Sequence, residues 1–134
     1  MTGENKRRNI GLEAGRADRA LDAARLLHAS GFFEDAVTRV YAAAFHYAKA
    51  LLLIEGLEVR THAGVRNQLG MNFVVTGRLE PATAAHLTQL QALREQSDYD
   101  TGAVFTEGMA AEALSRAERF RAAARQILES EGYL

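Results

Sequence analysis

Hydrophobic and polar positions alternate along most of this chain with a period of three to four residues. That period is typical of amphipathic α-helices, and the abundant alanine and leucine are strong helix formers. The first predicted helix runs from about Leu12 to Ser30, with Gly31 as its C-terminal cap, and the second runs from about Phe33 to Gly56. The apolar stripes consist of Ala17, Ala20, Leu21, Ala24 and Leu27 or His28 in the first helix, and of Val37, Val40, Tyr41, Ala44, Phe45, Ala48, Leu51 and Leu52 in the second.

Three further helices are predicted in the second half of the chain. Thr61 is a suitable N-cap for a short third helix that ends at Gly77. Glu80-Pro81 has the pattern of a cap followed by a first-turn proline and begins the fourth helix, and the last helix begins near Thr106. The apolar positions are Val65, Leu69, Phe73 and Val74 in the third helix, Ala84, Leu87, Leu90, Gln91 and Leu93 in the fourth, and Met109, Ala113, Ala117, Phe120, Ala124, Ile127 and Leu128 in the last.

Short connections between these helices favour antiparallel packing of neighbours. The predicted fold is therefore all-α, an antiparallel up-down helical bundle of four main helices and one short helix. A chain of 134 residues buries about two thirds of its unfolded surface on folding, so we expect a single domain over residues 1–134. About the first eight residues are expected to be disordered.

The composition excludes several classes of chemistry. The chain has no cysteine, which removes disulfides, thiolate metal sites and cysteine nucleophiles. Its longest apolar run, Ala48 to Ile54, is interrupted by Lys49 and is too short to span a bilayer, and no apolar signal core follows the basic first residues. We therefore expect a soluble, cytoplasmic protein with no membrane partner. The net charge of −1 gives no global attraction for a polyanion, which would have to bind a local patch.

The fourth predicted helix ends in a cluster of ionisable groups formed by Arg94, Asp98 and Tyr99. Arg94 and Asp98 are four positions apart, so one interpretation is a surface ion pair that contributes a few tenths of a kcal/mol. The other is that Arg94 faces a cleft and holds a phosphate, because a planar guanidinium matches two phosphate oxygens at once. Tyr99 would then donate a hydrogen bond to the same ligand, or it anchors the end of the bundle.

A second group of cationic residues lies on the second predicted helix. Arg39 and His46 are two helical turns apart, and Lys49 lies beside His46 on the same face. A histidine on such a helix is more often structural than catalytic. His62 falls in the first turn after Thr61, where the helix dipole disfavours its cationic form. We expect His62 to be a neutral donor to a backbone carbonyl or, as the alternative, a ligand for an anion.

Metal binding and cofactor chemistry have no support in the sequence. The four histidines His28, His46, His62 and His86 fall on different predicted helices, and none forms the helical pair with an acidic neighbour that a zinc site requires. No strand precedes a glycine-rich loop, and no serine lies in a nucleophile-elbow context. We therefore expect neither a metal nor a cofactor.

Five segments, taken in order, resemble the HEPN family of small helical proteins, and the resemblance covers nearly the whole chain. After an N-terminal amphipathic helix they are Arg39-Val40-Tyr41-Ala42-Ala43-Ala44-Phe45-His46 leading into Lys49-Ala50-Leu51-Leu52, Thr61-His62-Ala63-Gly64-Val65, Phe73-Val74-Val75-Thr76-Gly77-Arg78-Leu79, and Leu93-Arg94 with Asp98-Tyr99-Asp100. The branch that is most similar comprises single-domain prokaryotic proteins often encoded beside a minimal nucleotidyltransferase. The resemblance implies a homodimer with a polar cleft at its interface, and a minimal nucleotidyltransferase as a partner protein.

Catalytic members of this family are metal-independent ribonucleases with an Arg followed, after about four to six residues, by a His. Arg94 matches the Arg, but Asp98 and Tyr99 stand where the His is expected. Arg39 and His46 have six residues between them, yet they lie in the second helix, so we interpret that match as a coincidence. A phenol and a carboxyl ordinarily titrate about three units from neutrality on opposite sides, and neither suits the abstraction of a ribose 2′-hydroxyl proton.

Two functions follow from these observations. The first is a nucleotide- or RNA-binding, or partner-docking, module of a toxin–antitoxin or defence system without strong catalysis. Its candidate binding residues are Arg94, Asp98, Tyr99, Arg39, His46, Lys49 and His62. The alternative is a metal-independent ribonuclease toxin that uses Arg94 with Tyr99, or with His46. Three aromatic residues, Tyr41, Phe45 and Tyr47, point to more than one side of one helix and predict surplus apolar surface for a two-fold dimer.

Overall fold

The computed structural model describes residues 2–134, which form five α-helices and one π-helical turn. The elements are α1 (Gly3–Ala29), α2 (Phe33–Ile54), α3 (His62–Leu69), η1 (Gly70–Val74), α4 (Pro81–Tyr99) and α5 (Glu107–Ser130). Residues 2–134 contain no strand, so the prediction of an all-α bundle with four main helices and one short helix is confirmed.

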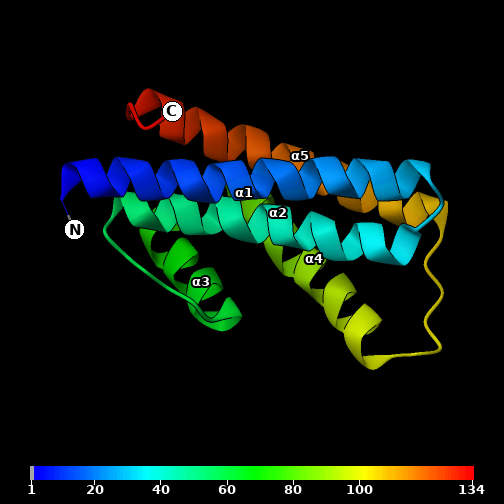
Figure 1. Cartoon of the computed structure of the whole chain (residues 1–134). Coiled ribbons are helices and arrows are strands. Elements are labelled where there is room, and N and C mark those ends of the chain that lie inside the picture. The colour runs from blue at the N-terminus through cyan, green and yellow to red at the C-terminus, as the bar shows by residue number, and fades with distance from the viewer. Residues whose placement is uncertain (1) are drawn as a thin grey trace.

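The central element of the bundle is α2, which packs against each of the other four α-helices. It lies side by side with α1, to which it is joined by a tight turn, while α3 and α4 project from the side of α2 that faces away from α1 (Figure 1). The middle of α2 is almost entirely buried, because its alanines let the neighbouring helices approach closely. This leaves one exposed edge of α2, bordered by α1 on one side and by α3 and α4 on the other.

The ends of the helices follow the local signals in the sequence. The side chains of Thr61 and Thr106 each accept a hydrogen bond from the backbone N–H three residues later. The predicted N-cap at Thr61 and the predicted start of the last helix near Thr106 are therefore confirmed. Pro81 occupies the first position of α4, as predicted. Gly31, after α1, has a φ of 85°, a conformation that other L-residues adopt only at a cost.

The start of α1 corrects two predictions. The helix begins at Gly3 instead of about Leu12, and residues 3–8 are helical where disorder was expected; Met1 lies outside the described residues. Thr2 caps the helix by accepting a hydrogen bond from the N–H of Asn5. The Lys6 ammonium donates to the carbonyl of Ile54 over 2.9 Å, and the Arg7 guanidinium donates to the carbonyl of Gly132. These polar contacts with the ends of α2 and α5 anchor a segment that has little apolar surface of its own.

The third predicted helix also differs in its second half. The α-helix ends at Leu69, and the chain continues as the π-helical turn η1 before it reaches Gly77. The wider turn leaves Phe73 fully buried, with the guanidinium of Arg78 lying 4.2 Å from the centre of its ring. Arg78 in turn bridges Glu55 and Glu131, which fixes the end of η1 against the ends of α2 and α5.

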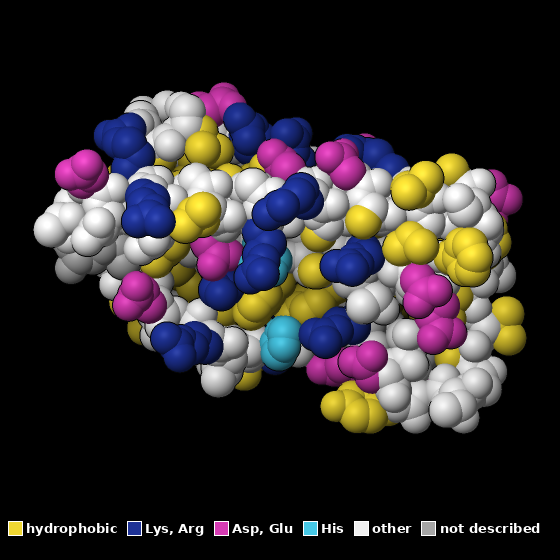
Figure 2. Space-filling view, viewed as in Figure 1, with side chains coloured by type: hydrophobic (Ala, Val, Ile, Leu, Met, Phe, Trp, Pro, Cys, Tyr) yellow, Lys and Arg dark blue, Asp and Glu magenta, His cyan; other side chains and the backbone are white. Residues whose placement is uncertain are grey.

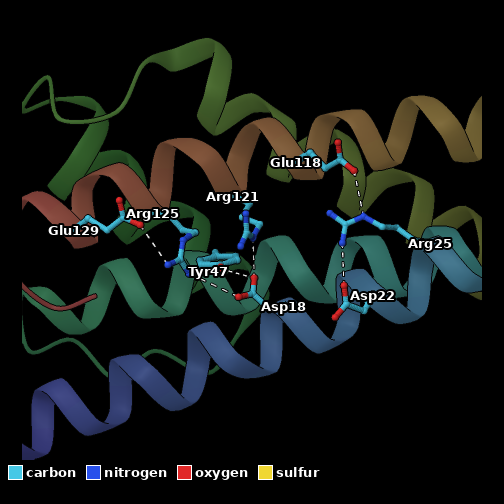
Figure 3. Close-up of polar contacts among 8 residues, drawn as sticks. All are labelled: Asp18, Asp22, Arg25, Tyr47, Glu118, Arg121, Arg125 and Glu129. Carbon is cyan, nitrogen blue, oxygen red and sulfur yellow. Dashed lines mark hydrogen bonds and ion pairs between the residues drawn. The ribbon is translucent and has the colours of Figure 1, made fainter.

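A buried tyrosine joins three helices on the opposite side of α2. The hydroxyl of Tyr47 donates to Asp18 on α1, and Asp18 also accepts a hydrogen bond of 2.8 Å from Arg121 on α5 (Figure 3). Burial disfavours the charged form of Asp18, but the hydrogen bonds from Arg121 and Tyr47 outweigh it and hold its pKa below the ordinary value. Tyr41 and Tyr47 are both buried within this single chain. The prediction that they contribute surplus apolar surface is therefore wrong.

Candidate functional site

The exposed edge of α2 forms one wall of a pocket that also receives residues from α3 and α4. The pocket has a volume of ≈ 450 Å³, within the usual range for ligand sites. We call it the arginine pocket, and its lining consists of Thr38, Arg39, Tyr41, Ala42, Phe45, His46, His62 and Arg94. Figure 2 shows Lys and Arg side chains gathered around a hollow with a hydrophobic floor, and histidine side chains beside them.

The spacing of the α2 residues explains why they share this pocket. Thr38, Ala42 and Phe45 recur at intervals of three and four, which places them on one face of the helix. Arg39 and His46 border the same face at its edge towards α1, and both line the pocket. The prediction that Arg39 and His46 share a helical face is therefore confirmed, and Arg94 of α4 lines the same pocket.

Tyr41 and His62 connect α2 to α3 at the floor of the pocket. The Tyr41 hydroxyl lies 2.6 Å from Nδ1 of His62, and the two rings are in contact, with centroids 5.5 Å apart. Burial raises the pKa of Tyr41 to about 12, so its phenol remains protonated. Burial, together with the nearby charges of Arg94 and Arg66, lowers the pKa of His62. The lowered pKa favours the neutral form of His62, in the direction expected, but the group beside Nδ1 is a phenol instead of a backbone carbonyl.

The N-terminus of α3 fixes the position of His62. Thr61 accepts the hydrogen bond from the N–H of Gly64 over 3.0 Å, which closes the first turn. A Cβ atom at Gly64 would lie 2.6 Å from Oγ1 of Thr61 and 2.7 Å from a methyl group of Val59. Only glycine fits this close approach, so Gly64 allows the turn that carries His62 towards Tyr41.

Arg94 forms the predicted ion pair with Asp98 and also lines the pocket. Its Nε lies 3.6 Å from a carboxylate oxygen of Asp98, the predicted ion pair on the surface of α4. Its guanidinium also lies 5.5 Å from the centre of the Tyr41 ring and lines the pocket. Tyr99 is different: its side chain is 85 % exposed and is not part of the pocket lining.

His46 is held from the opposite side by a carboxylate of α1. Nδ1 of His46 lies 2.6 Å from Glu13, whose other oxygen lies 3.3 Å from the ammonium of Lys49. Burial disfavours the charge on Glu13, but the hydrogen bond from His46 and the charge of Lys49 outweigh it and lower the pKa of Glu13. An ionised carboxylate only accepts hydrogen bonds, so Nδ1 of His46 donates, and in the neutral ring Nε2 is left as an acceptor.

Of the seven candidate residues, Arg39, His46, His62 and Arg94 line one pocket. Lys49 lies next to it, 5.6 Å from the centre of the Phe45 ring, and Asp98 contacts it through Arg94. The sequence reasoning assigned Tyr41 and Phe45 to the apolar stripe alone and overlooked Glu13. The position of Tyr41 at the polar edge of that stripe could have indicated its role in the site. No local pattern links Glu13 to His46, which lies 33 positions later.

Among residues 2–134, no group of three His, Asp or Glu side chains comes together in an arrangement that could hold a metal ion. None of the helices within residues 2–134 combines the length and the apolar character needed to cross a bilayer.

Comparison with known proteins assigns most of the chain to one family. A sequence profile described as the HEPN domain matches residues 14–127. This range includes every residue of the arginine pocket as well as Asp18 and Arg121, whereas Glu13 lies one position before its start.

Curated relatives come from archaea and bacteria. A Methanocaldococcus jannaschii protein named "putative toxin" is 41% identical over 85 residues, which is 63% of each chain. A Pyrococcus horikoshii "UPF0332 protein" is 43% identical over 68 residues, 51% of this chain and 48% of the relative. A Thermotoga maritima "UPF0332 protein" is 32% identical over 114 residues, 85% of this chain and 86% of the relative. The chain thus spans about half to two thirds of the first two relatives.

Proposed function

The chain belongs to the HEPN domain family, and from that premise we propose that it is a binding module that holds a phosphate of a nucleotide or an RNA in the arginine pocket. Arg94 is the proposed phosphate ligand. Arg39 and the imidazoles of His46 and His62 complete the polar lining around it.

The observation that carries this proposal is the charge of the pocket lining. It contains two arginines and two histidines, and no aspartate or glutamate. The whole chain has a net charge of −1, so the positive lining is a local departure from a balanced surface. Guanidinium groups form bidentate, charge-assisted hydrogen bonds with phosphate, and the partly buried ring of Phe45 in the pocket wall suits a nucleobase.

The biological setting that we propose is a toxin–antitoxin or defence system. Support comes from relatives named as toxins, which are 41% and 31% identical to this chain over 85 residues each. In this proposal the protein is a homodimer and docks a minimal nucleotidyltransferase protein. The exposed phenol of Tyr99, at the end of α4, is available to such a partner.

The test is replacement of Arg94 by alanine. We expect the fold to be retained and the affinity for adenosine monophosphate and for a 12-nucleotide RNA to fall on the order of tenfold, the loss of one charge-assisted contact. The slope of log K against log salt for the RNA should decrease by about 0.7. Arg116 is the matched control, because it also pairs with a carboxylate one turn away on its own helix, at 3.4 Å, but is not part of this pocket. Equal affinities for Arg94→Ala and wild type at 50 and 200 mM salt would exclude the site.

A second candidate function, a metal-independent ribonuclease, is favoured by one specific contact. Glu13 orients His46 through Nδ1, which leaves Nε2 as a potential base in the same pocket as Arg94. Arg39 and His46, whose spacing was interpreted as a coincidence from the sequence, line the same pocket as Arg94. A cleavage assay in chelator on the wild type, Arg94→Ala and His46→Ala separates the two functions.

A further inference from the structure

The arginine pocket continues into a second hollow on the α1 side of α2. This hollow, the outer groove, has a volume of ≈ 530 Å³ and is lined by Arg16, Arg19, Ala20, Ala23, Arg39, Ala42 and His46. Arg39, Ala42 and His46 line both spaces, so the two join along one edge of α2. Together they form a single concave path from Arg94 on α4 to Arg16 on α1.

The charge along this path is entirely of one sign. The combined lining contains four arginines and two histidines, and no carboxylate residue. Among residues 2–134, Arg16, Arg19 and Arg39 form no ion pair, although seventeen other ionisable residues have an oppositely charged partner within 4 Å, His46 included. All three are exposed. Three guanidiniums are thus free to bind an external anion.

The geometry of the lining suits an extended ligand better than a compact one. Arg16 and Arg19 are one turn apart on α1, and Arg39 and His46 are two turns apart on α2, which is about 10 Å along the helix axis. A single phosphate held by Arg94 would leave Arg16 and Arg19 unused. Ala20, Ala23 and Ala42 have small side chains, so a polymer backbone can lie close to the helices between the arginines.

We infer that the outer groove binds the sugar–phosphate backbone of single-stranded RNA, with Arg16 and Arg19 as phosphate ligands beyond the one at Arg94. The inference rests on the proposed function and specifies its ligand as a polynucleotide. A single strand is favoured over a duplex because Phe45, half-buried in the pocket, offers a ring on which an unpaired base can stack. That ring also distinguishes RNA from an acidic protein segment, which would need the arginines alone.

The experiment compares three probes on the wild type and on Arg16→Glu/Arg19→Glu: adenosine monophosphate, a 12-nucleotide single-stranded RNA and the corresponding duplex. Both arginines are exposed and unpaired, so the double variant should fold, which circular dichroism checks. We expect unchanged affinity for the mononucleotide and a loss on the order of tenfold for the single strand at 150 mM salt. The salt slope should decrease by about 1.4, two contacts at about 0.7 each. Arg119→Glu is the control, because Arg119 is exposed on α5 and lines neither space.

The outcomes separate this inference from the proposed function. If the wild type binds neither the mononucleotide nor RNA, the proposed function and this inference are both overturned. Mononucleotide binding that depends on Arg94, combined with RNA binding that the double variant leaves unchanged, would overturn only the inference. Equal losses in the double variant and in Arg119→Glu would show a general charge effect and would also overturn it. Tighter binding of the duplex than of the single strand would contradict the assignment to unpaired RNA.

Discussion

The hydroxyl of Tyr41 and Nδ1 of His62 lie 2.6 Å apart, and this contact joins α2 to α3 at the floor of the arginine pocket. The charges of Arg94, Arg66 and Glu95 act on both members of this pair. A neutral imidazole that accepts the phenol proton on Nδ1 carries its own proton on Nε2 and is then a donor. Nδ1 of His46 donates to Glu13, so Nε2 is an acceptor when the ring is neutral. The pocket then offers one donor that suits a phosphate oxygen and one acceptor that suits an N–H group of a base.

The first prediction concerns the stability of the protein between pH 7.5 and 5.5. The pKa of His62 is lowered from 6.5, so the unfolded chain binds a proton before the folded one does. The contribution of His62 is complete above pH 6.5 and is lost as the pH falls towards the lowered value. In thermal melting we expect the wild type to lose stability over this range relative to His62→Gln. Parallel melting temperatures for the two proteins would contradict the neutral state of His62.

The second prediction concerns Gly64. Alanine at this position would place a methyl group 2.6 Å from Oγ1 of Thr61 and 2.7 Å from a methyl group of Val59, so the capping side chain of Thr61 and the side chain of Val59 must shift. We expect Gly64→Ala to destabilise the fold by about 1–3 kcal/mol, the usual cost of overpacking, and to weaken phosphate binding through displacement of His62. Gly11→Ala is the control, because a Cβ atom added at Gly11 has no other heavy atom within 4 Å. Denaturant unfolding and nucleotide binding measure the two effects, and a neutral Gly64→Ala would show that the turn adapts without moving His62.

The third prediction concerns the contact between Asp18 and Tyr47. Removal of the Asp18 carboxylate leaves a buried hydroxyl without its acceptor, so Asp18→Ala should reduce the free energy of unfolding by about 1–2 kcal/mol. Because its pKa is lowered, the contribution of Asp18 is present above pH 3.8 and is lost as the pH falls through the lowered value. Asp22, one turn later on α1, is the control, because its pair with Arg25 is exposed and should contribute little. Equal losses of unfolding free energy in Asp18→Ala and Asp22→Ala would show that the contact between Asp18 and Tyr47 is not the source of the stabilisation.

The helices could be predicted because their signals are local. Thr61, Pro81, Thr106 and Gly31 each act on the backbone within a few residues, and the structure places helix ends at all of them. The start of α1 could not be predicted in this way. Residues 3–8 are polar, and their helix depends on contacts with the carbonyls of Ile54 and Gly132, 48 and 125 positions away. Tertiary contacts there outweigh the absence of an apolar stripe.

Only the features of the site that lie on a single helix could be predicted from the sequence. Periodicity places Arg39 and His46 on one face, and the cluster at the end of α4 identifies Arg94. The contacts that shape the pocket join different helices, Glu13 with His46 and Tyr41 with His62, and no spacing rule indicates them. Tyr99 shows the limit of this approach: its proximity to Arg94 in the sequence suggested a shared ligand, but its exposed side chain is not part of the pocket lining.

The fourth prediction concerns assembly. Six apolar side chains are more than half exposed in the single chain, and burial of such surface stabilises association. They are Leu12, Leu26, Phe32, Met71, Val75 and Val104. Together with the dimer implied by the family resemblance, this predicts a two-fold homodimer of twice 14.7 kDa. Sedimentation equilibrium at micromolar concentration measures the mass, and a monomer alone at that concentration would remove the prediction.

The last prediction concerns RNA cleavage, for which we expect slow turnover or none in the purified protein. Cleavage without a metal needs a base for the 2′-hydroxyl and an acid for the departing 5′-oxygen. Nε2 of His46 can accept the first proton, since Glu13 fixes the ring. The acid is the missing part: the lowered pKa of His62 leaves little imidazolium at neutral pH, and the phenol of Tyr41, with a pKa of about 12, donates its proton reluctantly.

A cleavage assay in chelator distinguishes the binding function from the ribonuclease function. It compares the wild type with Arg94→Ala, His46→Ala, Glu13→Gln and Tyr99→Phe, and Arg119→Ala is the control for contaminating nuclease. Residual activity that is equal in all of these proteins belongs to a contaminant and agrees with the binding function. Robust cleavage that Arg94→Ala and His46→Ala abolish would establish the ribonuclease instead. In that case Glu13→Gln should retain RNA binding but lower the rate, because it keeps the shape of the side chain and removes the charge that orients His46. Unaltered cleavage in Glu13→Gln would then assign His46 a role without this carboxylate.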